Sequence, residues 1–293
     1  MTQRSVSSLI QWVDAVTLQF ERAKPSLYFG HGTSNAADEA AWLVTHATGV
    51  TFQVLADLPN TPISVAQARR IGAIADERLK TRKPLAYLIH EAWLGEHRFY
   101  VDERVIVPRS FIAELLRLKC RAWKTPRRIL DLCTGSGCLA IVAAYRYPKA
   151  TVDAVDLSRD ALTVARRNVR DHALTDRVHI VESDLFSALE GERYDLILTN
   201  PPYVDAPSMR RLPAEYRHEP SLALAAGKDG LDLVRRIVAD APRHLHPGGT
   251  LVVELGHNRD VFVRTYQNLP VRWLDTSAGD EFVFAWQPIL RNA

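Results

Sequence analysis

The stretch RRILDLCTGSGCLAI, residues 127–141, decides the fold. A short apolar run reaches Asp131, and the turn Thr134-Gly135-Ser136-Gly137 then leads into a second apolar run. A strand that passes through a glycine turn into a helix is typical of an open parallel sheet, whose ligands lie outside the carboxyl ends of the strands. Gly135 and Gly137 have no side chain, so the backbone can come close to a ligand there.

The chain after residue 110 alternates short apolar strands with amphipathic helices. We expect strands at residues 127–133, 151–158, 178–184, 194–200, 248–256 and 282–286. The segments between them that have helical spacing are residues 110–123, 139–148, 159–173 and 231–245. This alternation predicts an α/β fold, a mainly parallel sheet with helices on both faces.

The first hundred residues have helical spacing instead. Helices are expected over residues 5–20, from a cap at Ser34 or Asn35 through Val44, and from Ser64 to a point before Pro84. The stretch RFYVDERVIVPRS, residues 98–110, has period-two character around Asp102-Glu103, which predicts a β-hairpin. We therefore divide the chain into a helical domain, a hairpin linker and an α/β domain, at residues 1–95, 96–109 and 110–293.

Composition is that of a soluble globular protein, with 47% hydrophobic and 24% charged residues among 293. No apolar run approaches the roughly 18–20 residues that cross a bilayer, and the N-terminus lacks a secretory signal pattern. The three cysteines, Cys120, Cys133 and Cys138, suit neither a disulfide framework nor a usual zinc site. We expect a cytoplasmic protein without a metal, and the net charge of +3 does not demand a nucleic-acid partner.

The glycine turn by itself indicates little more than a tight connection between a strand and a helix. It departs from G-x-G-x-x-G because Cys133 occupies the first glycine position, which favours a nucleoside site over a dinucleotide site. Asp156, at the end of the next strand, can accept both hydroxyls of a ribose. The alternative is that Asp156 caps the following helix, but Ser158 suits that role better.

The third strand ends in Ser183-Asp184-Leu185-Phe186. Asp184 could bind an adenine amino group while Leu185 or Phe186 covers the ring. Together, Asp131, Asp156 and Asp184 place three carboxylates around one turn, and no phosphate-binding lysine follows it. That charge pattern favours a positively charged nucleoside, and S-adenosyl-L-methionine has the required sulfonium and ammonium groups.

The fourth strand leads into the stretch NPPY, residues 200–203, at the same edge of the sheet. Pro201 and Pro202 have fixed φ angles and cannot donate to a ladder, so they hold the chain extended. The side-chain oxygen of Asn200 and the carbonyl of Pro201 could then accept both hydrogens of one NH₂ group, with Tyr203 against the flat group that carries it. The alternative is an ordinary loop, since Asn before Pro often starts a turn.

This arrangement would meet a specific chemical need. An amide nitrogen is a poor nucleophile because its lone pair is delocalised. Two fixed acceptors would orient the NH₂ group and turn its lone pair toward a methyl group for an in-line displacement. Positioning of this kind can supply about 7–11 kcal/mol in well-oriented reactions. We assign no general base.

The segments LDLCTGSG, AVDLS, SDLF and NPPYV, in that order, resemble class I S-adenosylmethionine-dependent methyltransferases that act on planar NH₂ groups. FYVDERVIVPRS and YRHEPSLALAAGKDGLDLVRRI resemble the protein glutamine methyltransferases among them, and YFGHGTSNAADEAAWLV resembles the branch that acts on large-subunit ribosomal protein L-three. The resemblance implies a Rossmann-like, seven-stranded sheet with a reversed last strand, a helical substrate domain, and N5-methylation of a glutamine during ribosome assembly. It implies cofactor contacts at Thr134, Gly135, Ser136, Gly137, Asp156 and Asp184.

The leading rival function is glutamine methylation of release factors. The sequence SFIAE, residues 110–114, departs from the Pro-Asp-Thr-Glu of that branch. Adenine methylation of nucleic acid and a non-catalytic assembly role are further alternatives. Arg109 could contact the substrate or anchor the hairpin, and His31 could contact the substrate or lie in a turn; we favour the structural role for both. Glu254 is expected either to approach the site or to face solvent. The sequence leaves open whether the protein is a monomer or a homodimer.

Overall fold

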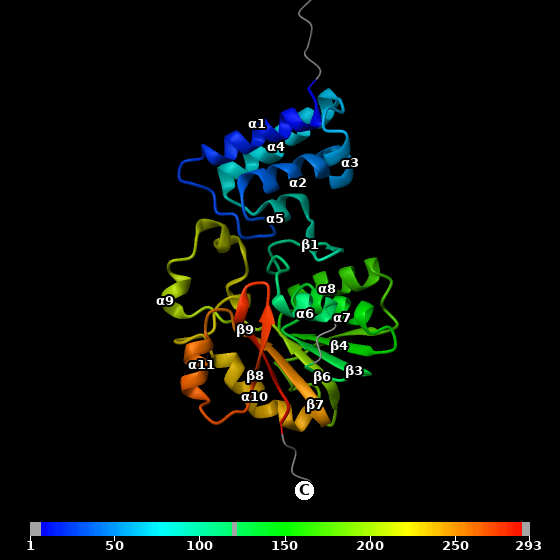
Figure 1. The fold of residues 1–293 in the computed structure, drawn as a ribbon, viewed down its shortest axis with the longest axis vertical. Helices are drawn as coiled ribbons and strands as arrows, with labels where there is room; N and C mark the ends of the chain where they lie inside the picture. The colour runs from blue at the N-terminus through cyan, green and yellow to red at the C-terminus, as the bar shows by residue number, and fades with distance from the viewer. Residues whose placement is uncertain (1–6, 119–121, 289–293) are drawn as a thin grey trace, which may run out of the picture. The chain divides into compact units, whose positions relative to one another are not determined.

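The computed structural model describes residues 7–118 and 122–288 and divides them into two compact units (Figure 1). The helical unit contains the residues up to Glu91 together with Pro213–His218. The sheet unit contains Ala92–Leu212 and the residues from Glu219 onward. The short segment 213–218 therefore packs with the N-terminal helices, although it lies more than a hundred residues beyond them in the sequence.

The helical unit is built from α1 (Leu9–Glu21), α2 (Ala36–Thr48), α3 (Phe52–Asp57), α4 (Val65–Thr81) and α5 (Leu85–Ile89). The three long helices match the expected ones, and α1, α2 and α4 pack together (Figure 1). Asn35 caps α2 by accepting a hydrogen bond from Asp38 N at 2.9 Å, so Asn35 and not Ser34 is the cap. Ser64 caps α4. The spacing did not predict α3 and α5, because five or six residues are too few to show a helical period.

Glu215 joins the segment 213–218 to the helices through buried charges. Its carboxylate is fully buried and accepts hydrogen bonds from Tyr28 N at 3.0 Å and Arg78 Nη1 at 3.4 Å. Arg82 Nη2 lies 2.8 Å from the same oxygen. Arg78 is 1% exposed and also donates to Glu39 at 2.7 Å, so this one guanidinium neutralises two buried carboxylates.

Replacing Arg78 with alanine is expected to destabilise the helical unit by about 3–5 kcal/mol, because Glu39 would lose its cation and Glu215 would keep only Arg82. The midpoint of urea unfolding, followed by tryptophan fluorescence, measures the loss. Arg69, exposed on the same helix, provides the matched control, and Arg69→Ala should change the midpoint little. Equal shifts of the unfolding midpoint would show that the buried ion pairs of Arg78 stabilise the fold no more than the exposed Arg69 does.

The sheet unit contains a seven-stranded sheet of order β5-β4-β3-β6-β7-β9-β8. The strands are β3 (Arg128–Leu132), β4 (Thr151–Asp156), β5 (Val178–Glu182), β6 (Tyr194–Thr199), β7 (Leu245–Glu254), β8 (Arg272–Thr276) and β9 (Gly279–Trp286). The first five are parallel, and β9 runs antiparallel to both of its neighbours. The mainly parallel sheet and the reversed last strand are thus confirmed, whereas β8 was missed.

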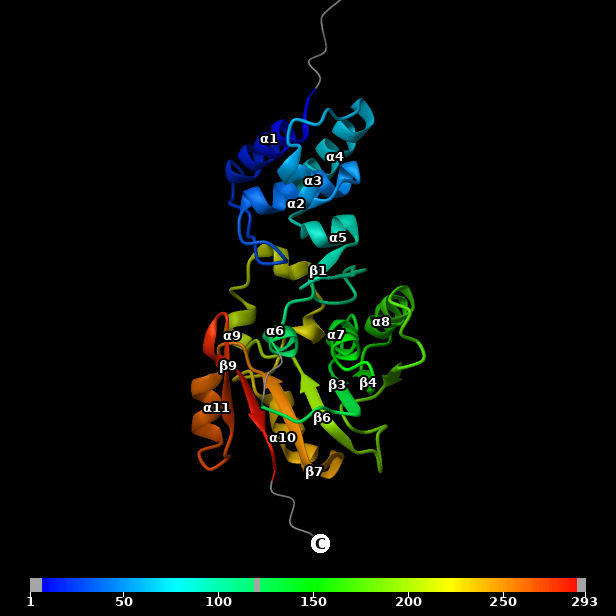
Figure 2. The same ribbon diagram turned by 45° about the vertical axis from the view of Figure 1, so that its right-hand side comes forward.

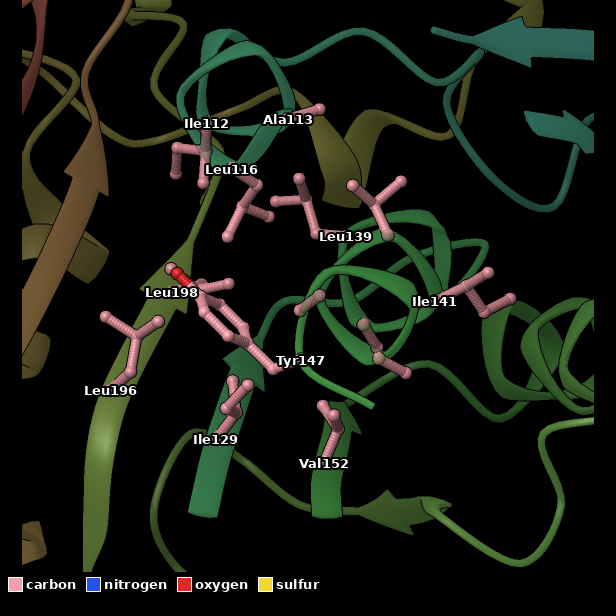
Figure 3. Packing of buried hydrophobic residues seen from close by; sticks show 14 of the residues in the cluster. Ile112, Ala113, Leu116, Ile129, Leu139, Ile141, Tyr147, Val152, Leu196 and Leu198 are labelled. Carbon is pink, nitrogen blue, oxygen red and sulfur yellow. The ribbon is translucent and has the colours of Figure 1, made fainter. Parts of the chain in front are cut away.

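Helices cover both faces of this sheet (Figure 2). One face packs against α6 (Phe111–Arg117), α7 (Cys138–Arg146) and α8 (Arg159–Asp171), and the other against α10 (Asp232–His244) and α11 (Arg259–Thr265). Adjacent residues of β3 serve opposite faces: Ile129 belongs to the cluster that contains Leu139 of α7 (Figure 3), and Leu130 belongs to the one that contains Ile237 of α10. Burial on both faces explains why the strands are continuous apolar runs. The short helices α9 (Ala206–Met209), η1 (Ala214–His218) and η2 (Ser221–Ala223) follow β6.

The predicted hairpin around Asp102-Glu103 was wrong. The hairpin consists of β1 (Ala92–Leu94) and β2 (His97–Phe99), and residues 100–110 contain no strand. Asp102 instead closes a local turn, since its carboxylate accepts from Arg104 N at 3.1 Å and Arg104 Nε at 2.9 Å. The alternation of polar and apolar residues there reflects this turn and not a ladder. The helix expected at 110–123 is confirmed over α6 only, since Leu118, Ala122 and Trp123 are not helical. Cys120 lies outside the described residues.

No helix within 7–118 and 122–288 is long and apolar enough to cross a membrane. In those ranges, no three His, Cys, Asp or Glu side chains gather where they could hold a metal ion.

Candidate active site

A cavity of about 180 Å³ opens at the carboxyl ends of β3 to β6, within the sheet unit. The strand order changes direction here, since β4 and β6 flank β3, and open α/β sheets bind ligands at such points. The cavity is lined by residues that follow four strands, by residues 104–106, and by parts of η2 and α10. Its polar lining residues include Gly135, Asp156, Ser158, Ser183, Asp184, Asn200, Arg104 and Arg236.

Asp131 shapes the glycine turn from behind. It is fully buried, and its Oδ2 accepts hydrogen bonds from Thr134 Oγ1 and from Ala140 N at 3.0 Å. Burial raises the pKa of this carboxyl to about 7. Thr134 and Ser136 are buried as well, and Gly137 leaves no room for a side chain beside Ala165. Of the turn 134–137, only Gly135 lines the cavity.

Asp156 lies at the centre of the cavity wall. Its two oxygens accept from Gly135 N and Ser158 N, each at 2.9 Å, and burial raises its pKa. Each carboxylate oxygen has a second lone pair, so both can still accept a hydroxyl proton. Ser158 caps α8 by accepting from Ala161 N at 3.2 Å, which confirms the predicted cap. The binding of a ribose by Asp156 stays a prediction.

Asp184 also lines the cavity but forms an ion pair with Arg236, at 2.8 Å. The expected set of three carboxylates is therefore incomplete at the cavity, because Asp131 is absent from the lining. Two arginines, Arg104 and Arg236, line it as well, and they pair with Asp102 and Asp184. Leu185 contributes an apolar wall, whereas the ring of Phe186 stacks on His244 at 4.5 Å in the core. Of these two residues, Leu185 is thus the one placed to cover a ligand ring.

The Asn200 carboxamide has a defined orientation. Its Nδ2 donates to the carbonyl oxygen of Arg109 at 3.1 Å. Its Oδ1 is buried and accepts no hydrogen bond from any residue in 7–118 or 122–288. A buried acceptor without a partner has a cost, and such groups commonly mark a site where a ligand supplies the missing donor. Asn200 is also one of the residues that line the cavity.

The rest of the Asn-Pro-Pro-Tyr loop is firmly packed. Pro202 lines the cavity, whereas Pro201 and Tyr203 are absent from its lining. The Tyr203 ring lies over Gly256, where a Cβ atom would come within 2.6 Å of ring Cε2. Asn258 Nδ2 donates to the carbonyl of Tyr203 at 2.6 Å, and burial raises the pKa of Tyr203 to about 12. Direct substrate contacts of Pro201, Pro202 and Tyr203 stay a prediction.

Arg109 has a structural role beside the site. Both of its terminal nitrogens donate to Glu219, at 2.6 and 2.7 Å. Sequence reasoning missed Glu219, because nothing in its local pattern indicates a partner 110 residues away. The expectation for Glu254 needs correction. Glu254 neither lines the cavity nor faces solvent but is buried against Ser110 Oγ at 2.6 Å. His31 lies in a bend, as expected, but its ring is buried against Tyr28 and Tyr216 of the helical unit.

Two family models match the chain. The model described as Methyltransferase small domain matches residues 111–212, and the PrmC N-terminal domain matches residues 29–89. Among solved structures, the hMettl16 catalytic domain in complex with MAT2A 3′UTR hairpin 6 is 18% identical, with a TM-score of 0.51. That alignment covers 75% of this chain and 81% of the other, and at this identity it indicates a shared fold alone.

The curated relatives are much more similar in sequence. A ribosomal protein uL3 glutamine methyltransferase of Neisseria meningitidis serogroup B is 52% identical over 88% of this chain and 86% of its own length. Proteins of the same name from Bordetella pertussis and Bradyrhizobium diazoefficiens are 50% and 46% identical, over 86% and 94% of this chain and 86% and 89% of their own lengths.

The fold and the cavity define a class I methyltransferase, whose methyl donor is S-adenosylmethionine. The free lone pairs of Asp156 suit the methyl donor, and the unpaired buried oxygen of Asn200 suits an amide that receives the methyl group. The chain belongs to the family of ribosomal protein uL3 glutamine methyltransferases.

Proposed function

We propose that this chain methylates the side-chain amide nitrogen of a glutamine in ribosomal protein uL3, in the cytoplasm and during ribosome assembly. The relatives that carry this activity in their names are 46–52% identical over 86–94% of the chain. None of the relatives described above is named for the rival release-factor function. The observation that carries the chemistry is the Asn200 carboxamide. Asn200 lines the cavity, and its buried Oδ1 accepts no hydrogen bond from the residues that the structure describes.

The proposed mechanism is one of positioning. Asn200 Oδ1 and the Pro201 carbonyl accept the two hydrogens of the glutamine NH₂ group and hold its nitrogen at the edge of the cavity. Asp156, Asp184 and Leu185 line the part of the cavity where the nucleoside would bind. S-Adenosylmethionine, when bound, supplies an electrophilic methyl group on a sulfonium sulfur.

The chain's residues then favour one bond exchange. Asn200 Oδ1 and the Pro201 carbonyl would hold the amide nitrogen in line with the methyl group, which would pass to that nitrogen while the electron pair of its former bond stayed on the donor's sulfur. The amide nitrogen loses one proton during or after this step, and the acceptors Asn200 and Pro201 stabilise the charge that develops on its NH₂ group. Fixed acceptors in a site shielded from water are effective because they need no reorganisation.

A labelling experiment tests the substrate. The purified chain, with methyl-labelled S-adenosylmethionine, is offered uL3, a release factor and ribosomal RNA in separate reactions. We expect label in one glutamine-containing peptide of uL3, located by mass spectrometry. The uL3 from cells that lack the enzyme should accept label, and uL3 from wild-type cells, already methylated, should not. Label only in the release factor or only in RNA would overturn the proposed substrate, and label nowhere would favour a non-catalytic role.

A further inference from the structure

Asn200 can present either its oxygen or its NH₂ group to a ligand, and a half-turn of the carboxamide exchanges the two. A backbone carbonyl has no proton to donate, so it can only accept. The carbonyl of Arg109, 3.1 Å from Asn200 Nδ2, therefore selects the orientation that directs Oδ1 elsewhere. If the Arg109 carbonyl moved, the carboxamide would lose the contact that distinguishes its two ends.

The position of the Arg109 carbonyl depends on Glu219. The segment 100–110 contains no strand, so no ladder fixes its backbone. Glu219 Oε1 accepts from Val107 N at 3.0 Å and from Arg109 Nη1 at 2.6 Å, and Oε2 accepts from Arg109 Nη2 at 2.7 Å. Arg109 Nη1 also donates to the carbonyl of Val107 at 3.1 Å. One carboxylate thus fixes both the backbone and the side chain of this segment.

A second buried carboxylate fixes the other side of Arg109. Glu254 Oε2 accepts from Ser110 Oγ at 2.6 Å and from Phe111 N at 2.9 Å. The side chains of Glu219 and Glu254 are almost completely buried, which strengthens their hydrogen bonds and makes them costly to lose. The Arg109 carbonyl lies between these two attachments, so its direction is closely defined.

We propose that Glu219 is a positioning residue for methyl transfer: through Arg109 it sets the orientation of Asn200. The inference rests on the proposed role of Asn200 in holding the amide. Glu219 itself is not one of the residues that line the cavity. Its neighbour Pro220 and residues Leu222 and Ala223 do line the cavity, so the effect of Glu219 on cofactor binding has to be measured separately.

A double-mutant cycle tests the proposal. Glu219→Gln keeps the size of the side chain but weakens the paired hydrogen bonds, and it should lower the single-turnover rate at saturating substrates by about 10–100-fold. In the Asn200→Ala background the same substitution should change the rate by less than about twofold, because the group that it positions is gone. An equal effect in both backgrounds would overturn the proposal.

Asp153→Asn is the matched control. Asp153 is a largely buried carboxylate of β4 that accepts from Arg128 at 3.2 Å and Tyr194 Oη at 2.8 Å, and it lies away from the cavity lining. It should lower the unfolding midpoint without changing the single-turnover rate. If Glu219→Gln fails to fold, Arg109→Met replaces it, since that variant keeps the Arg109 carbonyl but removes its tie to Glu219.

A crystal structure of Glu219→Gln gives a readout that does not depend on any substrate. We expect the contact between Asn200 Nδ2 and the Arg109 carbonyl to be lost or the carboxamide to be turned. An unchanged contact at 3.1 Å would overturn the inference. If the wild-type chain does not methylate uL3, the proposed function fails, and this crystallographic result still decides the role of Glu219.

Discussion

Replacing Asn200 with alanine is expected to lower the rate of methyl transfer by about 100-fold or more, the usual effect of removing one positioned hydrogen-bonding group from an active site. The physical reason is that the substrate NH₂ group would lose an acceptor that is already desolvated and oriented by Arg109. The affinity for S-adenosylmethionine should change little. Single-turnover rates measure the first effect, and titration calorimetry measures the second.

Two comparison variants make this result specific. Asn35→Ala removes a carboxamide that caps α2 in the helical unit and should leave the single-turnover rate at saturating substrate unchanged. Asn200→Asp keeps an oxygen but has no proton for the Arg109 carbonyl, so it should also be slow. Full methyl transfer by Asn200→Ala would show that the proposed positioning mechanism is wrong.

Replacing Asp156 with alanine should mainly weaken cofactor binding, by about 100-fold or more, since each hydrogen bond from a ribose hydroxyl to a carboxylate contributes roughly 1.5–3 kcal/mol. Part of the loss would come from the turn, because Asp156 also holds Gly135 N and Ser158 N at 2.9 Å. Titration calorimetry with S-adenosylmethionine gives the change in dissociation constant.

The rate at saturating cofactor separates this effect from that of Asn200. It should fall much less for Asp156→Ala than for Asn200→Ala. Asp160→Ala, four residues further along and exposed on α8, is the control and should bind the cofactor normally. Unchanged affinity of Asp156→Ala would remove this carboxylate from the cofactor site.

Much of this fold is predictable because its signals are local. The alternation of apolar strands with helices between residues 127 and 256 follows from burial of a parallel sheet on both faces, and the caps Ser64 and Ser158 follow from the chemistry of helix ends. β8 was missed because its residues 272–276 lie at the sheet edge, where burial imposes a weak pattern. The false hairpin arose because the pair Asp102–Arg104 imitates strand alternation.

The candidate site likewise has a part that the sequence predicts and a part that it does not. Asn200, Asp156 and Gly135 follow strands that meet at one edge of the sheet, so their order in the sequence is enough to bring them together. The contacts of Arg109 with Glu219 and of Ser110 with Glu254 span 110 and 144 residues, and no local pattern encodes them. The side-chain direction of Asp131 depends on packing under α7, which the sequence does not reveal.

The discontinuous helical unit limits how relatives can be recombined. A chimera that exchanges only the residues up to Glu91 would combine Arg78 and Arg82 of one protein with the Glu215 segment of another. Any mismatch between the two parents would then leave a charge buried without its counterion. Transplanting this unit to alter substrate choice therefore requires both pieces of chain, with residues 213–218 taken from the same parent as the helices.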